Sequence, residues 1–357
     1  MNTQRRKSRP LNLGGLSLGG EAPIRIQSMT TTPTREVEAT AHQISRLVLA
    51  GCEIVRMAVR DATDAEAIAA VKARSHCPLV ADIHFDPHLA LLSLKAGADG
   101  IRINPGNLAH RDALPHIVAL AEEKRAVIRV GVNLGSLRER RDDASVAADM
   151  DRCLDETLNS ALELEGLGAT QLKLSIKASS PEWTLTANRL LAERCDYPLH
   201  VGVTESGTLL SGAVRSTAAL TPLLREGIGD TVRISLAADP VNEVRAARAL
   251  LEALSLRQTG VRVIACPTCG RCANSDFFEL AARIEQKLEM IRQPLTVAVM
   301  GCEVNGPGEA SDADIGLAFS GSRAVLFVKG QKKNTVSVND AEAVLLEGIH
   351  SLLEKPV

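Results

Sequence analysis

Residues 79–104, LVADIHFDPHLALLSLKAGADGIRIN, contain two short apolar runs that flank a segment with helical apolar spacing. The runs 79–85 and 100–104 have the length and composition of strands, and residues 89–95 between them have the spacing of a helix. A strand, a helix and a second strand in this order imply that the strands are parallel and joined by a right-handed crossover. The stretch therefore predicts one βαβ unit of an α/β fold.

The same pattern recurs along the first 255 residues of the chain. Eight such units in roughly 230 residues match the size of a (β/α)8, or TIM-like, barrel. An open doubly wound sheet is the alternative, but no Gly-x-Gly-x-x-Gly motif follows the first strand, so we favour the barrel. The expected strands are 24–29, 53–59, 79–85, 100–104, 127–132, 172–177, 199–203 and 232–236, and the helices between them include 37–50, 65–73, 89–95, 147–167 and 241–254.

The remainder of the chain has a different pattern, which predicts a small α/β domain. A short polar linker near 255–260 separates the two patterns. We therefore expect a TIM-like barrel at 1–256 and a second domain at 257–357. In the second domain we expect strands at 261–266, 295–302, 315–319 and 324–328, and helices at 277–291 and 341–353.

Composition excludes some classes of function. The chain has 357 residues, a formal net charge of −2 and 24% charged residues, which gives no electrostatic case for nucleic acid as the main partner. No apolar run approaches the ~20 residues needed to cross a bilayer. The basic N-terminus has no apolar segment behind it, as a signal peptide would. We therefore expect a cytoplasmic protein.

Polar and charged residues recur near the C-terminal ends of the expected strands, where TIM barrels carry their chemistry. A single arginine at such a place is commonly part of a surface ion pair. Five cationic side chains in five strands around one axis, however, would repel each other, and burying unpaired charge is costly. A polyanionic ligand would relieve both costs, so we expect a phosphorylated or diphosphorylated substrate. The candidate substrate-binding residues are Arg56, Asp82, His84, Arg102, Asn104, Arg129, Asn133, Lys177, Thr204, Arg233 and Ser235.

Two carboxylates would share the barrel mouth with these cations. Asp82 is as well explained by neutralising its cationic neighbours as by a role in chemistry. Glu205 follows Thr204 at the end of the seventh strand, where a carboxylate can reach a substrate and have its pKa set by its neighbours. Glu205 is therefore the candidate catalytic acid or base.

Four of the eight cysteines form a candidate metal site, whereas the other four are isolated and are expected to be small buried apolar residues. Cys266, Cys269 and Cys272 fall within seven residues, and Cys302 ends the next expected strand. A glycine-rich loop follows and places a carboxylate, Glu309, nearby. Structural zinc would take four closed ligands. A catalytic 4Fe–4S cluster needs the same number and often keeps one replaceable ligand that is not cysteine, which Glu309 could supply. The spacing leaves both metals open.

Five motifs occur in an order and spacing that point to one family. They are Ala-Asp-Ile-His-Phe at 81–85, Arg-Ile-Asn-Pro-Gly-Asn at 102–107, Gly-Ile-Gly-Asp-Thr-Val-Arg at 227–233, Ala-Cys-Pro-Thr-Cys-Gly-Arg at 265–271 and Asn-Gly-Pro-Gly-Glu-Ala at 305–310. Any one of them would be a weak signal. The ordered set resembles the bacterial 4-hydroxy-3-methylbut-2-enyl diphosphate synthase family of the methylerythritol phosphate route to isoprenoids, over nearly the whole chain.

The resemblance implies an oxidoreductase that converts 2-C-methyl-D-erythritol 2,4-cyclodiphosphate to 4-hydroxy-3-methylbut-2-enyl diphosphate by two-electron reductive ring opening with loss of water. It implies a 4Fe–4S cluster on Cys266, Cys269, Cys302 and Glu309 in the second domain, and Glu205 as proton donor or base. It also implies flavodoxin or ferredoxin as electron donor and a homodimer in which the cluster domain of one subunit closes over the barrel of the other. The residues that match the family's substrate ligands are Arg56, Arg102, Arg129, Asn133, Lys177, Thr204, Arg233 and Ser235.

Three features depart from the family pattern, of which Arg215, where family members often carry Lys, is mild. Cys272 is not part of the family motif, and it is either a spectator or a competitor of Glu309 for the metal. The Arg- and Asp-rich stretch 138–148 is expected to be a solvated loop entering a helix. Two other functions remain open on the residues alone. One is a redox-inert phosphate-binding barrel of aldolase or pterin-synthase type with structural zinc, and the other is a non-enzymatic module that senses a diphosphate metabolite.

Overall fold

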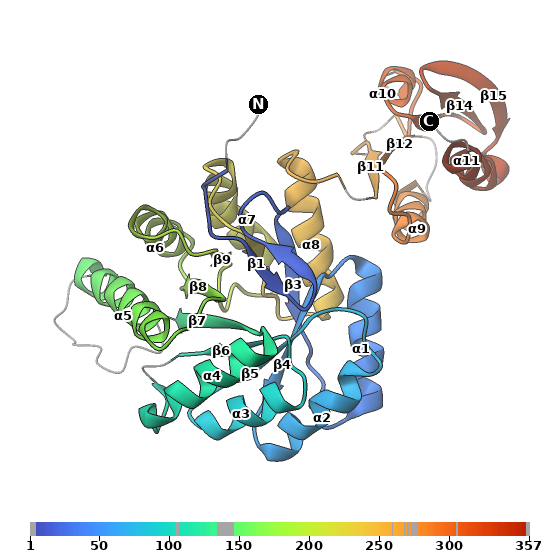
Figure 1. Ribbon diagram of the computed structural model, residues 1–357. Coiled ribbons are helices and arrows are strands. Elements are labelled where there is room, and N and C mark those ends of the chain that lie inside the picture. The colour runs from blue at the N-terminus through green and yellow to red at the C-terminus, as the bar shows by residue number, and fades with distance from the viewer. Residues whose placement is uncertain are drawn as a thin grey trace. The chain divides into compact units, whose positions relative to one another are not determined.

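The computed structural model describes residues 5–104, 107–133, 146–258, 260–267, 269, 271–272, 277–304 and 306–354. The chain divides into two compact units, Met1–Arg257 and Gln258–Val357, and each has an apolar core of its own. Figure 1 labels the helices and most of the strands of both units. Most of the stretch 138–148, for which the sequence predicts a solvated loop, lies outside the described residues. No helix in the described part of the chain combines the length and the apolar character that crossing a membrane requires.

Eight parallel strands form the centre of the first unit, and helices surround them (Figure 1). The strands pair in the order β8-β7-β6-β5-β4-β3-β10-β9, and a bridge from Leu174 in β8 to Leu199, just before β9, joins the two ends of that order. The sheet therefore closes, which confirms the predicted TIM-like barrel. The strands are β3 (Arg25–Met29), β4 (Ile54–Val59), β5 (Leu79–Ile83), β6 (Gly100–Ile103), β7 (Val127–Asn133), β8 (Leu172–Lys177), β9 (His200–Val201) and β10 (Thr231–Val232), and the helices are α1 (Val37–Ala50), α2 (Ala62–Lys72), α3 (Pro87–Lys95), α4 (Leu114–Lys124), α5 (Val146–Gly166), α6 (Pro181–Arg194), α7 (Leu209–Arg225) and α8 (Pro240–Ala253).

The last two barrel strands are shorter than the sequence predicts. Strands were expected at 199–203 and 232–236, but β9 and β10 contain two residues each. The two segments still run side by side past these strands, since Arg233 N donates to Val201 O at 3.1 Å. Gly202 accounts for the irregular pairing. The backbones approach so closely there that a Cβ on this residue would lie 2.3 Å from Arg233 O.

A hairpin that the sequence analysis missed covers one end of the barrel. It consists of the antiparallel strands β1 (Leu11–Leu13) and β2 (Leu16–Leu18). Its buried leucines pack against Ile54, Val80 and Val127, which lie at the N-terminal ends of β4, β5 and β7. The hairpin therefore closes the N-terminal end of the barrel and leaves the C-terminal strand ends for the site.

Three barrel helices begin at a polar cap followed directly by proline. The side chains of Asp86, Ser180 and Asp239 accept hydrogen bonds from backbone N–H groups in the first turns of α3, α6 and α8. Proline at the next position fixes a helical φ without losing a needed donor. Because each cap lies within three to seven residues of its strand, the strand ends are held by short, defined segments.

The described residues of the second unit form a five-stranded sheet with three helices. The strand order is β11-β12-β13-β14-β15, in which the first three strands are parallel and the last two pair antiparallel. Phe277 and Phe319 meet edge to face in its core, with ring centroids 6.2 Å apart. The elements are β11 (Val261–Ala265), α9 (Phe277–Leu288), β12 (Leu295–Met300), α10 (Gly306–Asp312), β13 (Ile315–Ser320), β14 (Arg323–Val328), β15 (Gln331–Ser337) and α11 (Val338–Leu353).

Two elements of the second unit differ from the sequence prediction. Strand β15 was not predicted because it is an exposed, polar strand without apolar alternation. The glycine-rich loop expected before Glu309 is wrong, since residues 306–312 form helix α10. Gly306 serves close packing here, because a Cβ on it would lie 3.1 Å from the Cβ atoms of both Met300 and Ala318. The glycine thus lets the helix lie against the sheet.

Candidate active site and candidate metal site

A cavity of about 240 Å³ lies at the C-terminal ends of the barrel strands. Its lining comes from β4 to β8 and from the segments that follow β9 and β10. The structure brings together there all the barrel residues proposed from the sequence except Asn104, which is buried but does not line the cavity. It adds Ser175, which lies between Lys173 and Lys177 on one face of β8 and could have been identified by that period of two. The lining residues are Arg56, Asp82, His84, Arg102, Arg129, Asn133, Ser175, Lys177, Thr204, Glu205, Arg233 and Ser235.

Among the described lining residues positive charge exceeds negative charge, since five Arg and Lys side chains face two carboxylates. Asp82 lies 3.8 Å from Arg56 Nε and 3.6 Å from Arg102 Nη1, distances too long for good hydrogen bonds. Its Oδ1 has no hydrogen-bond partner among the described atoms. Burial opposes ionisation of Asp82, but Arg56 and His84 hold its pKa well below the usual value. Asp82 therefore offsets part of the charge without immobilising either arginine.

Two of the cations are oriented by neutral protein oxygens. Arg102 Nη2 donates to Gly131 O at 2.9 Å, and Arg129 Nη1 donates to Gln27 Oε1 at 3.0 Å. Within the described part of the protein, the Nε atoms of both arginines are buried without an acceptor. Burial, and then repulsion from Arg56 and Arg102, lowers the pKa of Arg129 well below its ordinary value. Both arginines are therefore fixed in position and short of negative charge.

Arg233 differs because it has its own carboxylate. Its Nε and Nη2 each lie 3.1 Å from one oxygen of Glu243, which is buried in the first turn of α8. Ser28 Oγ donates to the same carboxylate at 2.8 Å. Glu243 was not among the predicted site residues. It could not have been found from its place in the sequence, since it comes from a helix and not from a strand end.

Gly131 gives Arg102 its space. A Cβ on this glycine would lie 2.7 Å from Arg102 Nε and 3.1 Å from Ser175 Oγ. We expect Gly131→Ala to displace the guanidinium and weaken binding of inorganic diphosphate by about tenfold or more, which is the loss of roughly one charge-assisted hydrogen bond. Isothermal titration calorimetry measures this. Gly166→Ala is the matched control, since a Cβ there has no neighbour within 4 Å, and unchanged affinity in Gly131→Ala would contradict the assignment.

Lys177 is held by hydrogen bonds to neutral side chains. Its Nζ donates to His200 Nε2 at 3.0 Å, so the other ring nitrogen carries the proton and faces Thr231 Oγ1 at 2.8 Å. Both Lys177 and His200 are buried. Burial lowers the pKa of Lys177 well below its ordinary value, and repulsion from Arg129 and Arg56 lowers it further. Burial, followed by the charge of Lys177, does the same to His200.

Binding of a polyanion should therefore take up protons. A diphosphate among these cations raises the pKa of Lys177, and also that of Lys173, which burial and Arg129 lower to about 7 in the free protein. Affinity for diphosphate should fall as pH rises above the pKa values of the free protein, because protonation and binding are linked. Calorimetry in buffers of different ionisation enthalpy measures the proton uptake. Lys177→Met should reduce it, and zero uptake by the unaltered protein would contradict this account.

Glu205 lies at the rim of the cavity and is exposed. Its backbone has φ of +52°, and Phe85, next to His84, has φ of +62° and is 63% exposed. Non-glycine residues rarely adopt this conformation, and such strain is concentrated at functional sites. The strained segment is anchored by Ser206, whose Oγ donates to Ser235 O.

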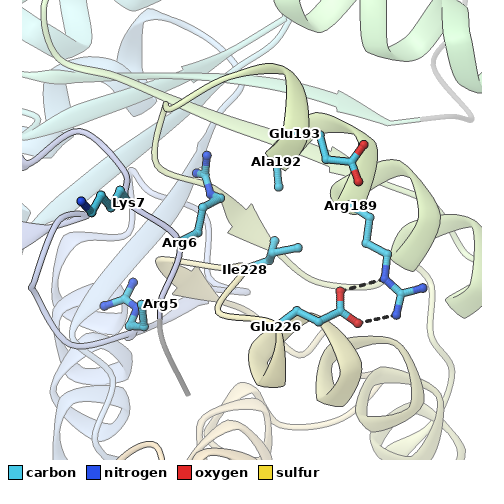
Figure 2. Close-up of a pocket in the computed structure, with 8 residues that line it drawn as sticks. All are labelled: Arg5, Arg6, Lys7, Arg189, Ala192, Glu193, Glu226 and Ile228. Carbon is cyan, nitrogen blue, oxygen red and sulfur yellow. Dashed lines mark hydrogen bonds and ion pairs between the residues drawn. The ribbon is translucent and has the colours of Figure 1, made fainter. Parts of the chain in front are cut away.

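A larger hollow of about 680 Å³ lies against the N-terminal segment (Figure 2). Two of its cations, Arg5 and Arg189, have close carboxylate partners. Arg5 is paired with Asp230 at 2.8 Å, and Arg189 Nε donates to Glu226 at 2.8 Å. Arg5 and Arg189 are therefore neutralised at close range, which makes this hollow a poorer candidate for an anionic substrate than the barrel mouth.

In the second unit, cysteines lie at one edge of the sheet. Cys266 directly follows β11, and Cys302 comes two residues after β12. These strands pair in parallel with Ala265 opposite Val299, so their C-terminal ends lie together. Gly301 N donates to Cys266 Sγ at 3.1 Å. A Cβ on Gly301 would lie 3.4 Å from Cys266 Sγ and 2.8 Å from Cys272 Sγ.

The predicted metal ligands are not assembled into a complete set. Cys269 and Glu309 are exposed, and no group of three His, Cys, Asp or Glu residues among those described is arranged to hold a metal ion. The donor chemistry nevertheless fits an iron–sulfur cluster. Thiols gather at one sheet edge, a backbone N–H already donates to one sulfur as in cluster sites, and Gly301 leaves room beside them.

Two family models match the chain, the GcpE TIM-barrel domain over residues 8–248 and the GcpE protein C-terminal domain over residues 262–351. The chain belongs to the GcpE family. A Geobacter sulfurreducens relative is 46% identical over 98% of this chain and 99% of its own length, and one from Lawsonia intracellularis is 47% identical over 94% and 93%. Both are named 4-hydroxy-3-methylbut-2-en-1-yl diphosphate synthase (flavodoxin).

Membership of the GcpE family confirms the resemblance predicted from the five motifs. A solved dihydropteroate synthase from Stenotrophomonas maltophilia superposes with a TM-score of 0.51 at 19% identity, covering 70% of this chain and 97% of its own. At that identity the likeness shows the barrel fold alone. The family assignment favours the diphosphate synthase over the redox-inert zinc barrel and the metabolite sensor.

Proposed function

We propose that this GcpE protein converts 2-C-methyl-D-erythritol 2,4-cyclodiphosphate to 4-hydroxy-3-methylbut-2-enyl diphosphate in the methylerythritol phosphate pathway. The observation that carries the proposal is the buried excess of positive charge at the barrel mouth, in a chain whose relatives bear the name of this enzyme. A cyclic diphosphate supplies the negative charge that Arg102, Arg129 and Lys177 lack. It is also small enough to suit a cavity of about 240 Å³.

The reaction is balanced by two electrons, two protons and one released water. Ring opening breaks one C–O bond between a carbon and the diphosphate, and a hydroxyl leaves the adjacent carbon as water while a C=C bond forms between the two carbons. The diphosphate arm gains negative charge as its bond breaks. Arg102, Arg129 and Lys177 are already in place to stabilise that charge, so little reorganisation is needed during the reaction.

The other lining residues would orient the substrate or move protons. Glu205, on the strained rim, would donate the proton that the departing hydroxyl needs. Arg233 is rigid because of Glu243 and would fix one phosphate. Arg56 donates to Met29 Sδ at 3.2 Å, a weak acceptor that a phosphate oxygen would readily replace. Asp82, His84, Asn133, Thr204 and Ser235 would contact the rest of the substrate.

Residues 257–357 would form the cluster domain, and residues 1–256 the substrate domain. Cys266, Cys269, Cys302 and Glu309 would hold a 4Fe–4S cluster. When bound, the cluster would supply the electrons and a Lewis-acidic iron. The Gly301 N–H would stay on Cys266 Sγ and disperse its negative charge.

We also propose an electron donor and an assembly. Flavodoxin appears in the names of the relatives, so flavodoxin or ferredoxin is the proposed donor. The cluster must come close to the barrel mouth for electrons to reach the substrate. A homodimer in which the cluster domain of one subunit closes over the barrel of the other would achieve this.

Anaerobic purification tests the proposed function. We expect a brown protein with about four irons per chain and formation of 4-hydroxy-3-methylbut-2-enyl diphosphate when the cyclodiphosphate and reduced flavodoxin are supplied. A colourless protein that contains zinc and fails to turn over the cyclodiphosphate would overturn the proposal in favour of a redox-inert barrel.

A further inference from the structure

The proposed ligand set leaves one clustered cysteine without a role. Cys272 follows Cys269 with two residues between them, as Cys269 follows Cys266. This Cys-x2-Cys-x2-Cys spacing is that of bacterial ferredoxins, in which the first three cysteines of the run ligate one cluster. With Cys302 the chain therefore has four cysteines, enough to fill every iron position of a 4Fe–4S cluster without a carboxylate.

The structure places Cys272 where a ligand is needed. Its sulfur and that of Cys266 both lie close to Gly301. A Cβ on this glycine would lie 2.8 Å from Cys272 Sγ and 3.4 Å from Cys266 Sγ. Both sulfurs must therefore lie within about 6 Å of each other, since their separation cannot exceed the sum of these two distances. Cys302 directly follows Gly301 in the chain. Cys272 thus lies at the edge of the sheet where the other thiols gather.

Two other candidate ligands are less buried than Cys272. Cys269 is exposed, and Glu309 is exposed in the first turn of α10. Cys272 is half-buried and packs, like Cys266, against the apolar core of the second unit. Cys272 N donates to Cys269 O at 3.0 Å, so a single turn joins these two residues. One turn can then direct both thiols to neighbouring irons.

We propose that Cys272 is a further cluster ligand, whose thiolate holds in the resting enzyme the iron that Glu309 would otherwise hold. The inference rests on the cluster of the proposed function. Thiolate is a better ligand than carboxylate for iron in such clusters. The resting cluster is then closed by four thiolates, and Glu309 is the alternative ligand for the iron that Cys272 holds. Cys272 therefore competes with Glu309 for one iron of the cluster.

Four anaerobically purified proteins test this role: the unaltered chain, Glu309→Ala, Cys272→Ser and the double variant. Iron per chain and the electron paramagnetic resonance spectrum are measured in each. We expect Glu309→Ala to keep about four irons, because Cys272 still closes the cluster. The double variant should lose one iron in four and show the signal of a 3Fe–4S cluster when oxidised. Cys272→Ser should keep its iron but change the spectrum of the reduced cluster, because the Glu309 carboxylate then replaces a thiolate on one iron.

Serine is close to cysteine in volume, so the change at residue 272 tests the ligand and not the packing. Cys195→Ser is the matched control, since Cys195 is half-buried in the barrel unit and its Sγ donates to Leu191 O. Equal iron loss in Glu309→Ala and the double variant, or a Cys272→Ser spectrum identical to that of the unaltered protein, would overturn the inference. An unaltered protein without iron would instead overturn the proposed function.

Discussion

Replacing Cys266 with serine should leave the protein folded but remove most of its iron, and activity should fall by more than about 100-fold, since loss of even outer groups around a metal costs 10–100-fold. Cys266 ends β11, and its sulfur already accepts the Gly301 N–H at 3.1 Å. A serine hydroxyl keeps that hydrogen bond but is a poor iron ligand. Iron analysis, visible absorbance and turnover of the cyclodiphosphate measure the loss, and circular dichroism measures the fold.

The control for this experiment is again Cys195→Ser, in which the hydroxyl can still donate to Leu191 O. It should keep both iron and activity. If Cys266→Ser retained its full iron content and turnover, the thiol would not be a ligand, and the second unit would need another explanation for its cysteines.

Replacing Arg129 with methionine should separate binding from stability. Diphosphate affinity should fall by roughly 10²–10³-fold, since truncating one partner of a buried charge pair costs about 2–5 kcal/mol. The melting temperature of the free protein should stay equal or rise. Arg129 is buried, its pKa is lowered by burial and by Arg56 and Arg102, and an apolar group of similar volume removes that repulsion. The hydrogen bond from Arg129 to Gln27 is lost.

Calorimetry with inorganic diphosphate and thermal unfolding measure the two effects. Arg189→Met is the comparison, because Arg189 is a partly exposed arginine paired with Glu226 (Figure 2). It should change neither quantity appreciably, as expected for a surface ion pair. Undiminished affinity in Arg129→Met, or a large fall in melting temperature, would show that Arg129 is a structural residue and not a ligand for the anion.

Much of the barrel and its mouth could be predicted from sequence because both depend on local patterns. Apolar runs at strand length and helical spacing between them gave the position of each barrel strand. A period of two then identified which side of a strand faces the axis, as for Arg102 in β6 or Lys177 in β8. Since parallel strands end at the same edge, residues far apart in the chain could be grouped into one cavity.

What could not be predicted depends on contacts between distant segments. Glu243 reaches Arg233 from a helix, and His200 holds Lys177 across two strands. The glycine-rich segment before Glu309 was interpreted as a loop, because the sequence does not show that Gly306 packs against Met300 and Ala318. The same limit applies to Cys272, whose place beside Gly301 follows from the sheet and not from spacing.

The β1–β2 hairpin has a consequence for kinetics. Its leucines pack against the N-terminal ends of β4, β5 and β7 and close that end of the barrel. Substrate, water and product then enter and leave at the C-terminal end of the barrel, where the cavity lies. The product keeps the diphosphate that the cations bind. It therefore competes with the next substrate molecule for the same binding site. Inhibition by product should therefore be competitive, and turnover should slow as product accumulates.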